Sequence, residues 1–132
     1  MISEDIYLQV IDIIKKSSQK YTNFKILYEK GEITKAGEVL WGAIQNLIFA
    51  IGLIYGKKLG SHKKLKLFWK NYCIEKNMYE HFKNFEDVEK LHTNFYYEFL
   101  DIEELNELIR KAEEFYEYLN NHLKELLTED KF

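Results

Sequence analysis

The chain has 132 residues, a formal net charge of −3, and a composition that is 46% hydrophobic and 16% aromatic. This length predicts one domain over residues 1–132, and the apolar share excludes a natively disordered chain. The absence of proline, with only six glycines, excludes proline-rich linkers and favours long, uninterrupted helices.

Helical spacing of apolar residues predicts five helices and no strand. The expected spans are about residues 4–30, 34–55, 62–77, 86–100 and 102–127. Gly31 suits the C-terminal end of the first helix, and Ser61 is the expected N-cap of the third. Asp101, followed three residues later by Glu104, forms a capping-box pattern for the fifth. The sequence therefore predicts an all-α fold, an up-and-down bundle of about five helices.

The second predicted helix carries two apolar stripes, which indicates the central element of the core. One stripe is Ala36, Leu40, Ala43, Leu47, Ala50 and Ile54, and the other is Gly37, Trp41, Ile44, Ile48, Ile51 and Tyr55. Gly42, Gly52 and Gly56 predict close backbone approach, within the fold or across a dimer. The apolar run over residues 39–55 contains Gln45 and Asn46 and is short for a membrane span, which favours a buried core helix.

Charge is distributed unevenly along the chain. Residues 33–74 hold seven lysines and one acid, a balance of +6, whereas residues 86–130 hold 14 acids and four bases, a balance of −10. The positive segment contains a basic cluster, Lys57, Lys58, His62, Lys63, Lys64, Lys66 and Lys70, interleaved with Tyr55, Phe68, Trp69 and Tyr72. Lysines can contact phosphates while exposed rings stack on bases, so the cluster is a candidate nucleic-acid interface. The alternative is a solvated lysine face whose rings point into the core.

His92 is expected on an apolar helix face with Val88, Leu91, Phe95 and Phe99. It is a candidate general acid or base, because the pKa of histidine is ordinarily near neutrality. The alternative is a structural histidine bonded to Glu38 or Asn46 of the second helix, since buried polar groups need partners. Asn94 is expected on the opposite side of the helix from His92.

Two segments resemble one known family. The stretch over residues 35–44, KAGEVLWGAI, resembles the A-x-E-x-L-W-x-A-x pattern of the archaeal PaREP helical proteins, within the HEPN superfamily (higher eukaryote and prokaryote nucleotide-binding). The stretch over residues 91–96, LHTNFY, resembles the family's L-H-x-N-F-Y signature. His62 resembles the histidine that family members often carry shortly after the first motif. The resemblance implies a HEPN-like bundle that commonly dimerises. Candidate structural or site-supporting residues are Glu38, Trp41, Asn46, Asn94 and Tyr96.

Many HEPN relatives are ribonucleases, toxins paired with nucleotidyltransferases, or RNA-binding modules. Their catalytic members carry Arg-x4-6-His, whereas Arg110 is the only arginine here and His122 follows it at the wrong spacing. We therefore expect an interaction domain that binds nucleic acid or nucleotide as a homodimer. The alternatives are a metal-independent endoribonuclease using His92 or His62, and a helical partner of a nucleotidyltransferase.

Neither a metal nor a cofactor is expected. Glu89 and His92 form one Glu-x-x-His motif, but a helical di-metal site needs a second motif and two further glutamates. No phosphate-cradling glycine loop is present. Cys73 is the only cysteine, which excludes an intramolecular disulfide and predicts a cytoplasmic setting, as does the acidic N-terminus. The abundance of lysine and glutamate is typical of proteins from hot environments.

Overall fold

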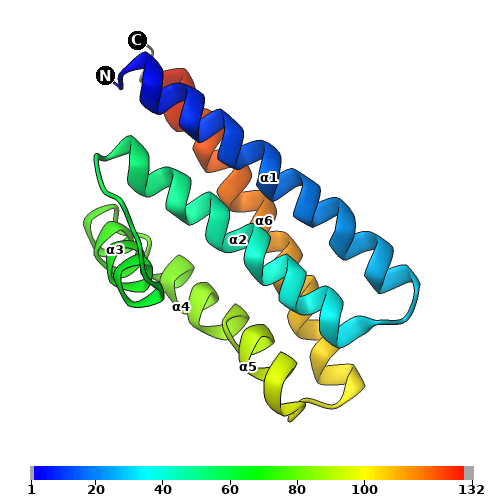
Figure 1. Ribbon diagram of the computed structural model, residues 1–132. Helices are drawn as coiled ribbons and strands as arrows, with labels where there is room; N and C mark the ends of the chain where they lie inside the picture. The colour runs from blue at the N-terminus through cyan, green and yellow to red at the C-terminus, as the bar shows by residue number, and fades with distance from the viewer. Residues whose placement is uncertain (1, 130–132) are drawn as a thin grey trace.

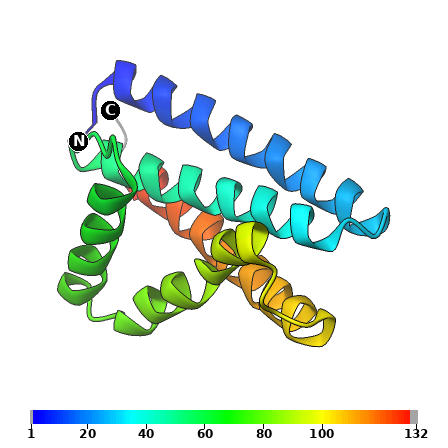
Figure 2. The same cartoon turned by 60° about the horizontal axis from the view of Figure 1, so that its bottom comes forward.

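The computed structural model describes residues 2–129, which form six helical segments and no strand. The segments are α1 (Glu4–Glu29), α2 (Ile33–Ile54), α3 (His62–Glu75), α4 (Tyr79–Val88), α5 (Lys90–Tyr97) and α6 (Ile102–Glu129). The long helices α1, α2 and α6 pack together, with α2 in contact with both of the others (Figures 1 and 2). Helix α3 leads away from the C-terminal end of α2 on the side opposite α1, and α4 and α5 return toward α2 and α6 (Figure 2). The predicted all-α bundle of about five helices is confirmed, with α4 and α5 as one helix interrupted at Glu89.

Local capping follows the predicted pattern. The Ser61 hydroxyl accepts a hydrogen bond from the Lys64 amide at 3.2 Å. The Asp101 carboxylate accepts from the Glu104 amide at 2.8 Å, and the Glu104 carboxylate accepts from the Asp101 amide at 3.1 Å. These reciprocal bonds satisfy amides that have no partner inside α6 and fix where that helix begins. Gly31, at φ +82°, turns the chain after α1 as predicted.

Helix α2 is the centre of the core. Twelve of its residues are buried, and it packs against α1, α3, α5 and α6. It passes a length-and-composition test for a membrane span, but most of the tested segment is buried inside the bundle, as in the core helix of a soluble protein. A Cβ on Gly52 would lie 2.6 Å from Leu59 Cδ1, so the chain following α2 folds back closely there. The predicted close approach is thus found at Gly52, whereas Gly42 meets only ordinary contacts and Gly56 lies in open space at φ +74°.

The segment that contains residues 91–96 departs from prediction. Helix begins at Tyr79 rather than near residue 86, is interrupted at Glu89, and ends before Glu98, at φ +45°. The Glu89 carbonyl accepts from the His92 amide three residues on, at 3.0 Å, and from the Thr93 amide four residues on, at 3.4 Å, so a single tight turn begins α5.

The side of α5 that faces the core also differs from prediction. Leu91 and Asn94 are buried, whereas His92 is exposed and Phe99 is 52% exposed. The prediction of a buried His92 opposite an outward Asn94 is therefore wrong. Leu91 and Asn94, three residues apart, share one side of this α-helix, and that side packs toward α2 and α6. The Asn94 side chain accepts a hydrogen bond from the Leu100 amide at 2.9 Å and so closes the turn after α5.

Candidate functional site

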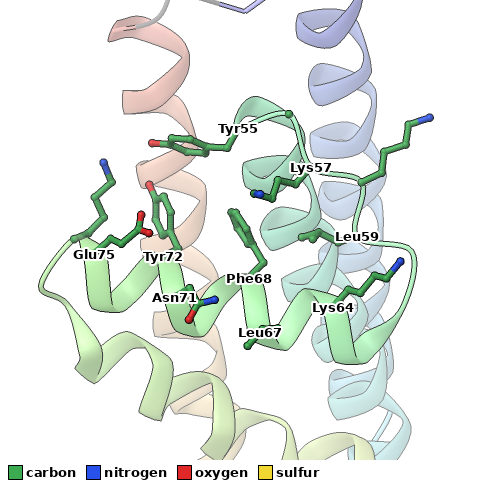
Figure 3. A pocket seen from close by; sticks show the side chains of 12 residues that line it. Tyr55, Lys57, Leu59, Lys64, Leu67, Phe68, Asn71, Tyr72 and Glu75 are labelled. Atoms are coloured by element: carbon green, nitrogen blue, oxygen red, sulfur yellow. The ribbon is translucent and has the colours of Figure 1, made fainter.

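A groove of about 590 Å³ lies between the Tyr55–Leu59 segment and the outer face of α3 (Figure 3). Its wall includes the lysines Lys57, Lys58, Lys64 and Lys76 and one acid, Glu75. The lysines come from both sides of the groove, two from the loop after α2 and two from α3 or its C-cap. Four cations against one carboxylate give the groove a positive balance, which favours anionic ligands.

Three aromatic rings line the same groove. The Tyr55 and Phe68 rings each lie against Tyr72, at centroid distances of 5.3 and 5.7 Å. Tyr55 is 42% exposed and Phe68 is partly buried, whereas Tyr72 is almost fully buried. The Lys76 ammonium lies 5.8 Å from the Tyr55 ring centre and 5.7 Å from that of Tyr72. The rings accessible to a ligand are therefore Tyr55 and, in part, Phe68.

Tyr72 connects the groove to a half-buried histidine cluster. Burial raises the pKa of Tyr72, so its hydroxyl stays protonated, and it forms a hydrogen bond with His122 Nε2 at 2.6 Å. His122 stacks on Tyr118, which stacks on His81 at 3.7 Å. Burial lowers the pKa of both His122 and His81, so both are neutral at pH 7. The wall of the groove at Tyr72 is thereby held by a hydrogen bond to a neutral imidazole.

The predicted basic cluster is divided by the fold. Lys57, Lys58 and Lys64 line the groove, and Lys63 is exposed beside it. His62 and Lys66 instead bind the Glu89 carboxylate, at 2.5 and 2.9 Å, and Lys70 lies 6.0 Å from the centre of the Phe82 ring. Trp69 is fully buried and donates to the His81 carbonyl, so for this ring the core alternative holds.

The basic cluster predicted from the sequence omitted Lys76, whose side chain lines the groove. Spacing in the sequence could have identified Lys76, because Lys64, Phe68, Tyr72 and Lys76 recur every four residues and so share one side of a helix. No local spacing indicated that His122, 50 residues after Tyr72, would contact this side chain.

The two family-like motifs meet in the structure. His92 Nδ1 lies 2.9 and 2.8 Å from the two oxygens of Glu38, joining α5 to α2. A carboxylate only accepts, so Nδ1 carries a proton and donates it, and Nε2 is the nitrogen left to exchange a proton with solvent or a ligand. Nε2 has no protein partner among the described residues, and the His92 side chain is 46% exposed. Tyr96, 65% exposed, packs edge-on against the imidazole at 5.2 Å.

His62 is engaged at both ring nitrogens. Its Nε2 donates to Glu89, and its Nδ1 then accepts from the Gln45 amide at 3.3 Å. The buried Trp41 ring lies 6.1 Å from the His62 ring. His62 therefore acts as a tie between α2, α3 and the α4–α5 junction, and of the two predicted histidines only His92 presents a nitrogen to solvent.

The remaining predicted residues lie apart from these groups. Asn46 accepts a hydrogen bond from Lys20 at 2.8 Å rather than from His92. Glu89 and His92, the Glu-x-x-His motif, turn to different partners. Across residues 2–129, no group of three His, Cys, Asp or Glu side chains is arranged to hold a metal ion.

No protein-family model, curated protein or solved structure gives a significant match to this chain.

Proposed function

We propose that this domain binds a nucleotide unit, either as a free nucleotide or within a single-stranded nucleic acid, in the groove between Tyr55–Leu59 and α3. The observation that carries the proposal is the placement of four lysines around accessible aromatic rings in one groove. Its volume of about 590 Å³ lies within the range of about 300–1,000 Å³ that is usual for small-ligand pockets. The resemblance to HEPN proteins, which include RNA-binding modules, supports the same ligand class.

Lysine and aromatic groups supply the two interactions that such a ligand needs. Each ammonium near a phosphate displaces a condensed counterion, which makes binding dependent on salt. A base stacked on Tyr55, which is 42% exposed, would contribute about 1–3 kcal/mol with little dependence on sequence. Glu75 lies on the groove wall and would keep the phosphates toward the lysine side.

Adjacent lysines allow a matched test. Lys64 lines the groove and Lys63 does not, so Lys64→Glu and Lys63→Glu make the same charge change one residue apart. Binding of fluorescent single-stranded RNA, single-stranded DNA and ATP is measured by anisotropy between about 50 and 200 mM salt. We expect Lys64→Glu to weaken binding about tenfold and to reduce the salt slope by about one, with a much smaller effect from Lys63→Glu.

Stacking is tested separately with Tyr55→Ser, which leaves every lysine in place. We expect a loss of about tenfold in affinity with an unchanged salt slope. Equal losses from Lys63→Glu and Lys64→Glu would mean diffuse charge attraction rather than a groove site. Undetectable binding at low salt would refute the proposal.

A second candidate is a metal-independent endoribonuclease that uses His92. The contact with Glu38 favours it, since a carboxylate on Nδ1–H orients a histidine whose Nε2 can accept a proton. Nε2 would take the proton of a ribose 2′-hydroxyl as that oxygen attacks the adjacent phosphate, and solvent would protonate the leaving oxygen. RNA cleavage in EDTA should fall about 100-fold in His92→Ala and persist in His62→Ala. Loss in His62→Ala alone would refute the assignment.

On the resemblance alone, we propose that the domain is a homodimer. Light scattering on the purified protein measures this directly, and a monomer at all concentrations would refute it.

A further inference from the structure

The corner between α5 and α6 exposes large apolar side chains. Tyr96, Tyr97, Phe99 and Ile102 are 65%, 77%, 52% and 57% exposed, respectively, and fall within seven consecutive residues. We call these four the corner patch. The three rings alone leave about 400 Å² of surface in solvent, taking about 200 Å² for each ring. An exposed apolar patch of this size on a single chain commonly marks an interaction site.

The corner is held in one conformation. The Glu98 amide bonds to the Asn94 carbonyl at 2.8 Å, and the Leu100 amide bonds to the buried Asn94 side chain at 2.9 Å. Asp101 and Glu104 then cap α6. Glu98 is at φ +45°, a left-handed conformation that few side chains adopt without strain. A patch fixed in this way loses little conformational entropy when a partner covers it.

Acidic side chains surround the patch. Residues 98–107 contain five acids and no base. Asp101 and Glu104 are used in capping, and Glu107 lies 3.8 Å from Arg110. Glu98 and Glu103 are exposed and have no ion pair among residues 2–129. At Glu98 and Glu103 the rim therefore presents negative charge with no ion-pair partner among residues 2–129.

We propose that the corner patch docks a lysine- or arginine-rich polypeptide segment of a partner protein, with apolar anchors that cover Tyr97 and Phe99. About 400 Å² of apolar surface is the share expected on one side of an interface that buries about 700 Å² per partner. A two-fold contact between copies would set Glu98 and Glu103 against the same acids, which like-charge repulsion disfavours. The acidic rim likewise disfavours nucleic acid.

The corner patch and the nucleotide groove are independent. The groove is bounded by Tyr55–Leu59 and α3, whereas the corner lies at the opposite end of α2, where α5 turns into α6 (Figures 1 and 2). A partner at the corner would leave the groove open, so the failure of one proposal does not affect the other.

The test uses a short amphipathic leucine–lysine peptide as the probe and the same peptide with glutamate for lysine as its control. Binding to the isotope-labelled full chain is followed by amide chemical shifts. We expect saturable shifts centred on residues 96–103 with the lysine peptide and none with the glutamate peptide. Phe99→Ser should weaken binding about tenfold, the effect of losing an anchor, whereas Leu8→Ser, at a residue 57% exposed on α1, should not.

Charge is tested with two exposed glutamates of α6. Glu103→Lys should weaken binding of the lysine peptide several-fold, and Glu114→Lys, farther along the helix, should have a smaller effect. Shifts centred elsewhere, or equal effects of the two substitutions, would overturn the proposal. So would a dimer in light scattering that Phe99→Ser dissociates, because a second copy would then occupy the corner patch.

Discussion

Asn94→Ala should destabilise the domain through one hydrogen bond. Asn94 is 1% exposed, and its side-chain oxygen is the acceptor for the Leu100 amide at 2.9 Å. The alanine variant leaves this amide without its acceptor beside the core, which costs about 1–3 kcal/mol. The better helix propensity of alanine returns at most about 0.7 kcal/mol. The net loss of about 1–2 kcal/mol is large against a total stability of about 5–15 kcal/mol.

Urea unfolding followed by far-UV circular dichroism measures this loss. The midpoint should fall with an unchanged m-value, because the surface exposed on unfolding is the same. Thermal unfolding should shift by about 4 °C for each kcal/mol in a domain of this size. Hydrogen exchange adds a local readout, since the Leu100 amide should lose its protection while amides of α2 keep theirs relative to global stability.

Thr93→Ala is the matched control, because Thr93 is exposed on the same helix and should change stability by less than about 0.5 kcal/mol. A loss in Asn94→Ala no larger than in Thr93→Ala would refute the assigned role of the side chain. Continued protection of the Leu100 amide from exchange in Asn94→Ala would also refute this role.

Three further predictions concern the Glu38–His92 contact, the half-buried histidines and Cys73. A double-mutant cycle with Glu38→Gln and His92→Phe should give a coupling of about 1 kcal/mol or less, because the side chains are 22% and 46% exposed; a coupling above about 2 kcal/mol would contradict this. Burial lowers the pKa of His122 and His81, so the unfolded chain binds protons more readily, and stability should fall as pH drops below about 6.5. Urea midpoints of wild type and His122→Gln between about pH 5 and 8 test this, and a wild type that does not lose stability relative to the variant at low pH would refute it. Burial, with a smaller contribution from Glu80, raises the pKa of Cys73 to about 12, so a disulfide reagent should label this thiol only after urea is added, and rapid native labelling would count against it.

The helices themselves could be predicted from local pattern. Ser61, Asp101 and Glu104 make the capping contacts that their spacing indicated, and Gly31 turns the chain after α1. The apolar stripes of α2 identified it as the central helix, since only a helix with several neighbours can bury so much of its surface. These features depend on residues within one or two turns of each other.

The candidate sites were predicted only in part. The lysines after α2 and at the start of α3 were identified, but Lys66 and His62 are taken up by Glu89, which lies on a different element. Tyr72 reaches His122 across 50 residues of sequence. No local spacing reports such contacts, because they depend on how helices pack rather than on how they are wound.

By itself, the sequence determined that this chain is an all-helical bundle centred on residues 34–55, with positive charge in its middle and negative charge in its last third. Only the tertiary structure decided which side of α5 faces the core. Leu91 and Asn94 are buried on that side, and His92 meets Glu38 at the surface. Packing against α2 and α6, rather than local periodicity, therefore determines which residues are available for function.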